Sequence, residues 1–305
     1  MARTSISGWA PVVGEWSFGG GVATYLSPPP GVDRRPFGIA VSALRLSEGD
    51  AAATVRWDRS DSDFAARLLF GYRSPNHEYY TVGLGGYGHA FVVSHYEPTR
   101  GWAAVALAGS PQNLLTEHDY QIRVRIRGQR VFFDFNGIQV LDQVLAAPLP
   151  EGQLGLFGWG HGGVSFSEIT ASKSHGKAFV VMKLDGSYDE LYREVIVPTA
   201  EKFELRAFHA GDMFGPGFIL DDIVNSIVES KVVIAEITSL NPNVFYEVGY
   251  AHAIGKPTIL LAEHGKALPF DISGYRCLFY ENSIGGKAKV EQALQKHLEA
   301  LFGPR

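Results

Sequence analysis

The sequence predicts a two-domain protein in which an all-β antiparallel sandwich precedes a C-terminal α/β domain. The chain has 305 residues, which is more than one hydrophobic core ordinarily serves. Its basic residues change type partway along: residues 1–172 hold thirteen arginines and no lysine, whereas residues 173–305 hold ten lysines and four arginines. The hydrophobic pattern changes at the same place, from short alternating runs to apolar strands separated by amphipathic helices.

We therefore expect a first domain at residues 1–172 and a second at residues 173–305. Residues 172–177 are small, polar and basic, which is typical of a short linker.

Composition limits the classes of function that remain open. With 46% hydrophobic and 19% charged residues the chain can bury a large core, which excludes a mainly disordered protein. A net charge of −5 without a basic tail argues against nucleic acid and membrane surfaces as partners. Cys277 is the single cysteine, so no intrachain disulfide forms. No long apolar segment is present, and we expect a cytoplasmic protein.

Short runs rich in Val, Ile, Phe and Tyr recur between glycine-bearing turns in the first domain, as expected of β-strands. In residues 121–127 apolar and polar side chains alternate, which places one face in a core and the other in water. Gly128 and the pair Asn136-Gly137 predict hairpin turns. The predicted strands are residues 38–44, 52–57, 65–72, 79–84, 91–95, 120–127, 130–135, 153–158 and 164–169. This number of short strands predicts a two-sheet sandwich.

The order of these elements resembles a concanavalin A-like (laminin G-like) jelly roll over roughly residues 15–172. The residues that carry the resemblance are Phe70-Gly71-Tyr72, Tyr79-Tyr80-Thr81-Val82, the run from Tyr120 to Gly137, and residues 152–158. The resemblance implies a binding or assembly module with a glycan or protein ligand. Some members cleave sugars, but we find no convincing acid pair for that role.

Two groups of residues in the first domain have alternative readings. Asp58, Asp61 and Asp63 have the chemistry of a calcium site, but a solvated hairpin turn explains them as well. Tryptophans at positions 57, 102 and 159 either stack on sugar rings or pack the core, which is the usual fate of tryptophan in a sandwich.

In the second domain apolar strands alternate with amphipathic helices, which predicts a parallel sheet covered on both faces. The expected strands are residues 178–182, 204–208, 232–237, 258–261 and 277–280. The expected helices are residues 188–202, 217–229, 242–254 and 287–301. About 125 residues suit a five-stranded flavodoxin-like sheet.

Ligands of such sheets bind at the carboxyl ends of the strands, so the loops at residues 183–187, 209–218 and 238–243 are the candidate binding loops. In the first, Lys183, Asp185 and Ser187 could hold phosphate or ribose hydroxyls, although Asp185-Gly186-Ser187 is also a common turn. In the second, Asp212 and Phe214 precede a helix whose free N–H groups could bind a phosphate.

The third loop leads into a helix with clear boundaries. Asn241 is a good N-cap, Pro242 suits the first helical position, and Gly255 suits the position after the helix. Glu247 lies in the second turn, beside the expected cleft, and its neighbours Tyr246 and Tyr250 either contact a base or pack. A carboxylate in this place is suited to chemistry.

Residues 179–261, and above all residues 241–257, resemble the nucleoside 2-deoxyribosyltransferase-like superfamily and its Toll/interleukin-1-receptor-like (TIR-like) relatives in bacteria. The shared features are an apolar strand ending in an acidic residue, here Glu236, an asparagine-rich loop with Asn241 and Asn243, and a helix with Glu247-Val248-Gly249-Tyr250-Ala251. The resemblance implies a nucleotide pocket in which Glu247 attacks or stabilises the anomeric carbon of ribose.

A carboxylate against that carbon stabilises or traps an oxocarbenium-like centre. In deoxyribosyltransferases an acidic residue lies six positions before the nucleophile, where this chain has Asn241. Nicotinamide leaves without a proton, so the departure favours NAD cleavage over base exchange, although Asp212, Asp221 or Asp222 could supply an acid.

We therefore expect an NAD nucleosidase that uses NAD as a substrate and needs no cofactor and no metal. The resemblance implies a bacterial antiphage or stress effector that self-associates and is regulated by its lectin-like N-terminal domain. A nucleotide sensor without catalysis and a nucleoside 2-deoxyribosyltransferase remain the alternatives.

Overall fold

The computed structural model describes residues 4–5, 8–27, 37–58, 64–213, 219–269, 272 and 274–303. The chain forms two compact units, one up to Ser174 and one from His175 onward. Two short segments, Arg127–Gln129 and Ala146–Pro148, group with the second unit. The last strand of the first unit continues to Lys173, and the first strand of the second begins at Gly176. The predicted linker is thus shortened to Ser174 and His175, because the residues on either side pair in sheets.

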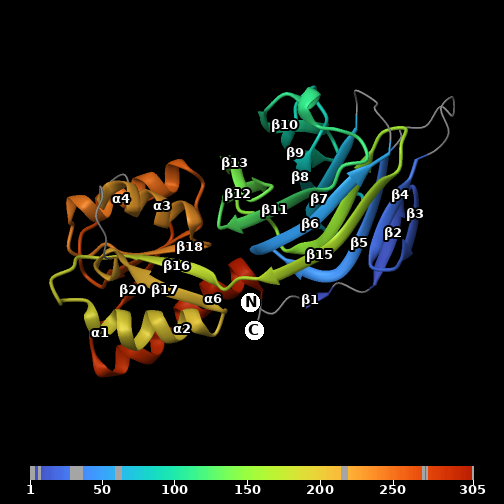
Figure 1. Cartoon of the computed structure of the whole chain (residues 1–305). Coiled ribbons are helices and arrows are strands. Elements are labelled where there is room, and N and C mark those ends of the chain that lie inside the picture. Colours follow the sequence, from blue (N-terminus) through green and yellow to red (C-terminus); the bar gives the residue numbers. More distant parts are fainter. Residues whose placement is uncertain are drawn as a thin grey trace. The chain divides into compact units, whose positions relative to one another are not determined.

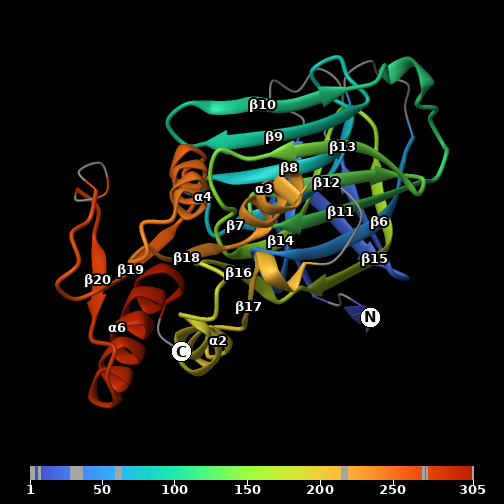
Figure 2. The ribbon, with the colours of Figure 1, turned by 90° about the vertical axis from the view of Figure 1, so that its left-hand side faces the viewer.

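The first unit is a sandwich of two antiparallel sheets (Figures 1 and 2), as the sequence predicts. One sheet has eight strands in the order β13-β12-β11-β6-β15-β4-β3, with β1 paired to β15. Its strands are β1 (Thr4–Ser5), β3 (Glu15–Gly19), β4 (Val22–Leu26), β6 (Gly49–Trp57), β11 (Tyr120–Arg127), β12 (Arg130–Phe135), β13 (Ile138–Val144) and β15 (Val164–Lys173).

The other sheet has seven strands in the order β10-β9-β8-β7-β14-β5-β2. Its strands are β2 (Trp9–Val13), β5 (Phe37–Leu46), β7 (Ala65–Tyr72), β8 (Tyr79–Leu84), β9 (Phe91–Glu97), β10 (Gly101–Ala108) and β14 (Gly152–Trp159). The sequence patterns did not predict β1, β2, β3, β4 or β10. A short 3-10 helix, Pro111–Asn113, follows β10.

The core of the first unit lies between the two sheets, where alternate residues of each strand point inward. In β11, Ile122, Val124 and Ile126 are buried, whereas Gln121 and Arg123 are exposed, which confirms the predicted alternation. The turn between β12 and β13 has positive φ at both Asn136 (48°) and Gly137 (82°), as a type I′ hairpin turn requires.

The second unit has a five-stranded parallel sheet in the order β17-β16-β18-β19-β20. Its strands are β16 (Gly176–Val181), β17 (Leu205–His209), β18 (Val232–Glu236), β19 (Thr258–Glu263) and β20 (Cys277–Tyr280). Its helices are α1 (Asp189–Leu191), a π-helical segment (Tyr192–Ile196), α2 (Val197–Glu201), a 3-10 turn (Ala210–Asp212), α3 (Ile219–Glu229), α4 (Pro242–Ala253) and α6 (Ile284–Phe302).

Helices cover both faces of this sheet, as predicted (Figure 1). One face packs against α2 and α6 through Ala200, Leu294 and Leu298, and the other packs against α3 and α4 through Ile227 and Val248. The predicted helix at residues 188–202 is interrupted by the π-helical segment. In the described residues no helix has both the length and the apolar character needed to cross a membrane.

We expect Leu156→Ala to destabilise the first unit by about 2 to 5 kcal/mol, because Leu156 on β14 is fully buried between the sheets and its loss leaves a cavity. The same change at Leu115, which is 59% exposed, should cost little. Urea unfolding of both variants gives the comparison, and equal losses of stability would contradict the position of the core.

Candidate functional site

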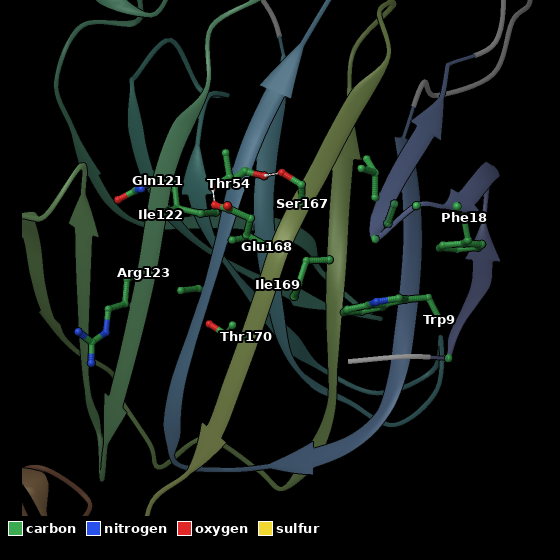
Figure 3. A pocket seen from close by; sticks show the side chains of 18 of the residues that line it. Trp9, Phe18, Thr54, Gln121, Ile122, Arg123, Ser167, Glu168, Ile169 and Thr170 are labelled. Atoms are coloured by element: carbon green, nitrogen blue, oxygen red, sulfur yellow. Dashed lines mark hydrogen bonds between the residues drawn. The ribbon is translucent and has the colours of Figure 1, made fainter. Parts of the chain in front are cut away.

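An open pocket of about 1340 Å³ lies beside β15 of the eight-stranded sheet and is lined by residues from both the outer face and the core-facing edge of that sheet (Figure 3). Strands β6, β11 and β15 form its floor, and β2 and the β3–β4 turn form one side. The sequence patterns did not predict this pocket.

Polar side chains cover the floor of the pocket because they occupy the outward positions of adjacent strands. Thr54 on β6 lies opposite Gln121 on β11 and opposite Ser167 on β15. In the next outward row, Ala52 lies between Arg123 and Thr170. The floor thus presents hydroxyl, amide and guanidinium groups that can donate hydrogen bonds to a ligand, the hydroxyls and the amide oxygen also accepting them.

Aromatic side chains form the opposite side of the pocket. Trp9 and Phe18 lie on the side of the pocket away from Arg123, and the Trp9 ring points toward β15 (Figure 3). Phe18 lies opposite the buried Ala23 of β4, and Trp9 packs against the core, so both rings are at the core-facing edge of the pocket. Phe18 is 39% exposed and stacks in parallel on Trp16 at a centroid distance of 6.2 Å, which fixes the orientation of its ring. The turn Gly19-Gly20-Gly21 beside Phe18 carries no side chains, so the approach to the ring is open.

Glu168 reaches the pocket because β15 is irregular at this point. The register of β15 against β6 shifts between Ser167, opposite Thr54, and Thr170, opposite Ala52. Two residues of β15 therefore oppose the single residue Ala53, which is a β-bulge, and Glu168 takes a φ of 51°. Its side chain is exposed and accepts a 2.7 Å hydrogen bond from the Thr54 hydroxyl.

A second group of aromatic residues lies on the outer face of the seven-stranded sheet. We call Tyr79, Tyr96, Trp102, Phe157 and Trp159 the aromatic cluster. Tyr79 stacks on Tyr96 at 4.8 Å, and Trp102 contacts Tyr96 at 5.3 Å and Phe157 at 5.1 Å. Trp102 and Trp159 are half-buried here, whereas Trp57 is sealed in the core against Phe64. The core interpretation therefore holds for Trp57.

In the second unit, α4 has the predicted boundaries, and Glu247 is half-buried on it. The Asn241 side chain caps α4 by accepting a 2.9 Å hydrogen bond from the Asn243 N–H. Gly255 has a φ of 67° just after the helix. Burial raises the pKa of the Glu247 carboxyl to about 7. Tyr246 is exposed, and Tyr250 packs against the core on the α3–α4 face.

Glu236 is fully buried at the end of β18 and belongs to a hydrogen-bonded group. Its carboxylate accepts bonds from the Thr238 N–H (3.2 Å), the Thr238 hydroxyl and the Tyr280 hydroxyl (3.1 Å). Tyr188 also hydrogen-bonds to it. Burial raises the pKa of Glu236, and these bonds oppose the rise.

The remaining predicted residues of the second unit make local contacts. Lys183 forms a 2.6 Å ion pair with Asp185, which also accepts a hydrogen bond from the Ser187 N–H. The Lys183 and Ser187 bonds lower the pKa of Asp185 to about 2. Asp212 accepts bonds from the His209 N–H (3.0 Å) and the Tyr192 hydroxyl (3.2 Å).

Phe214 lies outside the described residues. Within the described ranges, no recorded hydrogen bond or ion pair joins Glu247 to the Lys183 loop, to Asp212 or to Asn241. The individual roles predicted for these side chains stay predictions.

Among the described residues, no group of three or more His, Cys, Asp or Glu side chains could hold a metal ion. Asp58 is exposed, and the predicted calcium partners Asp61 and Asp63 lie outside the described residues.

No protein-family model matches this chain, and no curated protein matches it. Solved structures with a similar fold include the carbohydrate-binding module CBM66 from Bacillus subtilis, with 17% identity over 55% of this chain and 96% of the module and a TM-score of 0.47. A Bacillus licheniformis β-glucanase has 10% identity over 57% of this chain and 94% of the glucanase, with a TM-score of 0.41. A B. subtilis protein of unknown function with a galectin-like fold has 12% identity over 53% of this chain and 88% of its own, with a TM-score of 0.41.

These comparisons correct the predicted function. The structures found are sugar-binding, sugar-cleaving and galectin-like proteins, so the prediction of NAD cleavage by a TIR-like domain is wrong. The motif around Glu247 led to a wrong prediction because a capped helix with small residues serves the local fold as well as it would serve a nucleotide pocket. The N-terminal resemblance to concanavalin A-like proteins agrees with the comparisons.

We expect Glu247 to make the stability of the protein depend on pH. Its carboxyl pKa rises from 4.5 to about 7 on folding, so the folded state binds this proton more tightly and stability falls as the pH rises through that window. Glu247→Gln should match the original protein near pH 4 and unfold at a higher temperature near pH 8.5. Glu201→Gln, on an exposed position of α2, is the control. Thermal unfolding curves whose difference does not change with pH would contradict the shift.

Proposed function

We propose that the N-terminal unit is a saccharide-binding module and that its ligand occupies the pocket on the eight-stranded sheet. The single observation that carries this proposal is the combination, in one open pocket, of an aromatic side with a polar floor. Sugars have apolar C–H faces and hydroxyl edges, so they need a flat ring beneath one face and hydrogen-bonding groups along the edge. Phe18 and Trp9 supply the rings at the core-facing edge of the pocket, and Thr54, Gln121 and Arg123 supply polar groups on the outer face.

The polar groups of the floor are preorganised by the sheet. Gln121, Thr54 and Ser167 stand side by side on adjacent strands at fixed spacing, and the Thr54 hydroxyl is oriented by its bond to Glu168. Rigid strands lower the entropy that a binding site loses when it orders around a ligand.

Binding is favoured over sugar cleavage by the state of the two carboxylates in the pocket. Cleavage commonly needs a carboxylic acid that stays protonated and a second, free carboxylate. Asp134 is instead held by Arg125 at 3.0 and 3.2 Å, which leaves the exposed Glu168 as the one open carboxylate among the described lining residues. Neither environment is that of a buried general acid.

For the second unit we propose a flavodoxin-like fold, since the strand order β17-β16-β18-β19-β20 corresponds to the order 2-1-3-4-5 of that class. The proposal concerns the fold alone, because fold does not determine function.

We expect Phe18→Ala to weaken binding of neutral oligosaccharides about tenfold, because loss of one stacked ring removes roughly 1.5 kcal/mol of contact. Affinity is measured by calorimetry with a panel of neutral glucan, fructan and mannan oligosaccharides. Trp102→Ala, in the aromatic cluster on the other sheet, is the matched control and should leave the affinity unchanged. Loss of binding in Trp102→Ala with none in Phe18→Ala would move the site to the other sheet.

A further inference from the structure

Glu168 occupies a backbone conformation that the sequence does not favour. Its φ of 51° lies in the left-handed region, which a glutamate adopts with difficulty because its Cβ crowds the backbone. Such residues persist where the surrounding structure holds them, and they concentrate at functional sites. Here the bulge turns the Glu168 side chain onto the outer face, where it stands in the middle of the pocket beside Thr54 (Figure 3).

Most of the hydrogen-bonding capacity of this carboxylate faces the pocket. An ionised carboxylate has about four acceptor sites on its two oxygens. One is used by the Thr54 hydroxyl, and the side chain is otherwise exposed. A ligand in the pocket can therefore donate to Glu168 without displacing a protein group.

The other charges in the pocket are balanced by the protein. Arg123 pairs with Asp50 on the neighbouring strand β6, and Asp134 pairs with Arg125 at 3.0 Å. Glu168 differs from both: in the described part of the chain, no Lys, Arg or His nitrogen is recorded within 4 Å of its carboxylate. The pocket thus carries one negative charge that the described protein groups do not offset.

We propose, building on saccharide binding in this pocket, that Glu168 selects sugars bearing a protonated amine, such as oligomers of 2-amino-2-deoxyhexoses. An ammonium group offers three donors and a positive charge to the exposed carboxylate. A sugar whose amine is acetylated keeps the ring but loses the charge. A uronate or sulfated sugar places a like charge against Glu168 and is repelled.

The test compares two oligosaccharides of equal length and linkage, one of β-1,4-linked glucosamine and one of β-1,4-linked N-acetylglucosamine, below the pKa of the sugar amine and at low salt. The full chain should bind the amine form about fivefold more tightly, since an exposed charge pair contributes up to roughly 1 kcal/mol. Added salt should reduce this preference, because exposed charges are screened.

Glu168→Gln should abolish the preference while leaving the affinity for the acetylated oligomer unchanged, which also shows that the variant is folded. Glu117→Gln is the matched control, because Glu117 is an exposed glutamate with a φ of 55° that does not line the pocket. This control variant should retain the preference for the amine form.

Four outcomes would overturn the inference, and they differ in whether saccharide binding itself is also rejected. Binding of both oligomers with equal affinity, or an unchanged preference in Glu168→Gln, rejects the role of Glu168 but keeps saccharide binding. Competition by spermidine as strong as that by the amino sugar shows a general cation site and rejects the sugar selectivity. Absence of binding by either oligomer and by the neutral panel rejects the proposed function itself.

Discussion

The pocket depends on one constraint, the extra residue in β15. Phe166 and Ala171 are both buried, yet they lie five positions apart, an odd spacing that regular alternation would place on opposite faces of a sheet. The bulge at Glu168 and Ile169 resolves this conflict by shifting the phase of the strand. Both ends of β15 then contribute to one core. Glu168, which lies in the bulge, presents its carboxylate to solvent.

The same constraint explains why the pocket was not predicted from the sequence. The predicted strand at residues 164–169 treats β15 as regular, and a regular strand has no reason to hold Glu168 in a left-handed conformation. A signal was nevertheless present, since the apolar spacing in β15 changes from two residues, Val164 to Phe166, to three, Phe166 to Ile169. A break in period within a strand is the expected trace of a bulge, and an acidic residue at the break indicates which side chain it exposes.

Most of the strands that the sequence failed to predict lie at or next to the sheet edges, where the pattern is weakest. β3 and β10 are edge strands, β2 is an edge strand that contains Pro11, and β4 is next to the edge. In β10 small residues are exposed on both faces, so no alternation appears. The central strands of the first unit were predicted because burial determines which residue types occupy each of their faces. In β11, apolar residues occupy the buried face and polar residues the exposed face. Two of the strands that were not predicted, β2 and β3, carry Trp9 and Phe18. The aromatic side of the pocket was therefore not predicted either.

In the second unit local features were predictable and side-chain partnerships were not. The Asn241 cap, the Pro242 start and the Gly255 stop of α4 depend only on neighbouring residues, and each is present. Glu236 depends instead on Tyr280, which is 44 residues away, and on Tyr188, which no periodicity could connect to it.

Glu236, Glu247 and Glu168 differ in how deeply their carboxylates are buried. Glu236 is fully enclosed and its oxygens are occupied by donors of the fold, so it ties β18 to β20 and to the segment that contains Tyr188. Glu247 is half-buried, and burial favours its protonated form near neutral pH, which weakens it as a fixed negative charge. Glu168 is exposed, keeps acceptor sites open and stands in a pocket whose other charges are paired. A bound ligand must find polar groups that the protein has not already satisfied, and of the three carboxylates only that of Glu168 meets this condition while remaining a reachable charge.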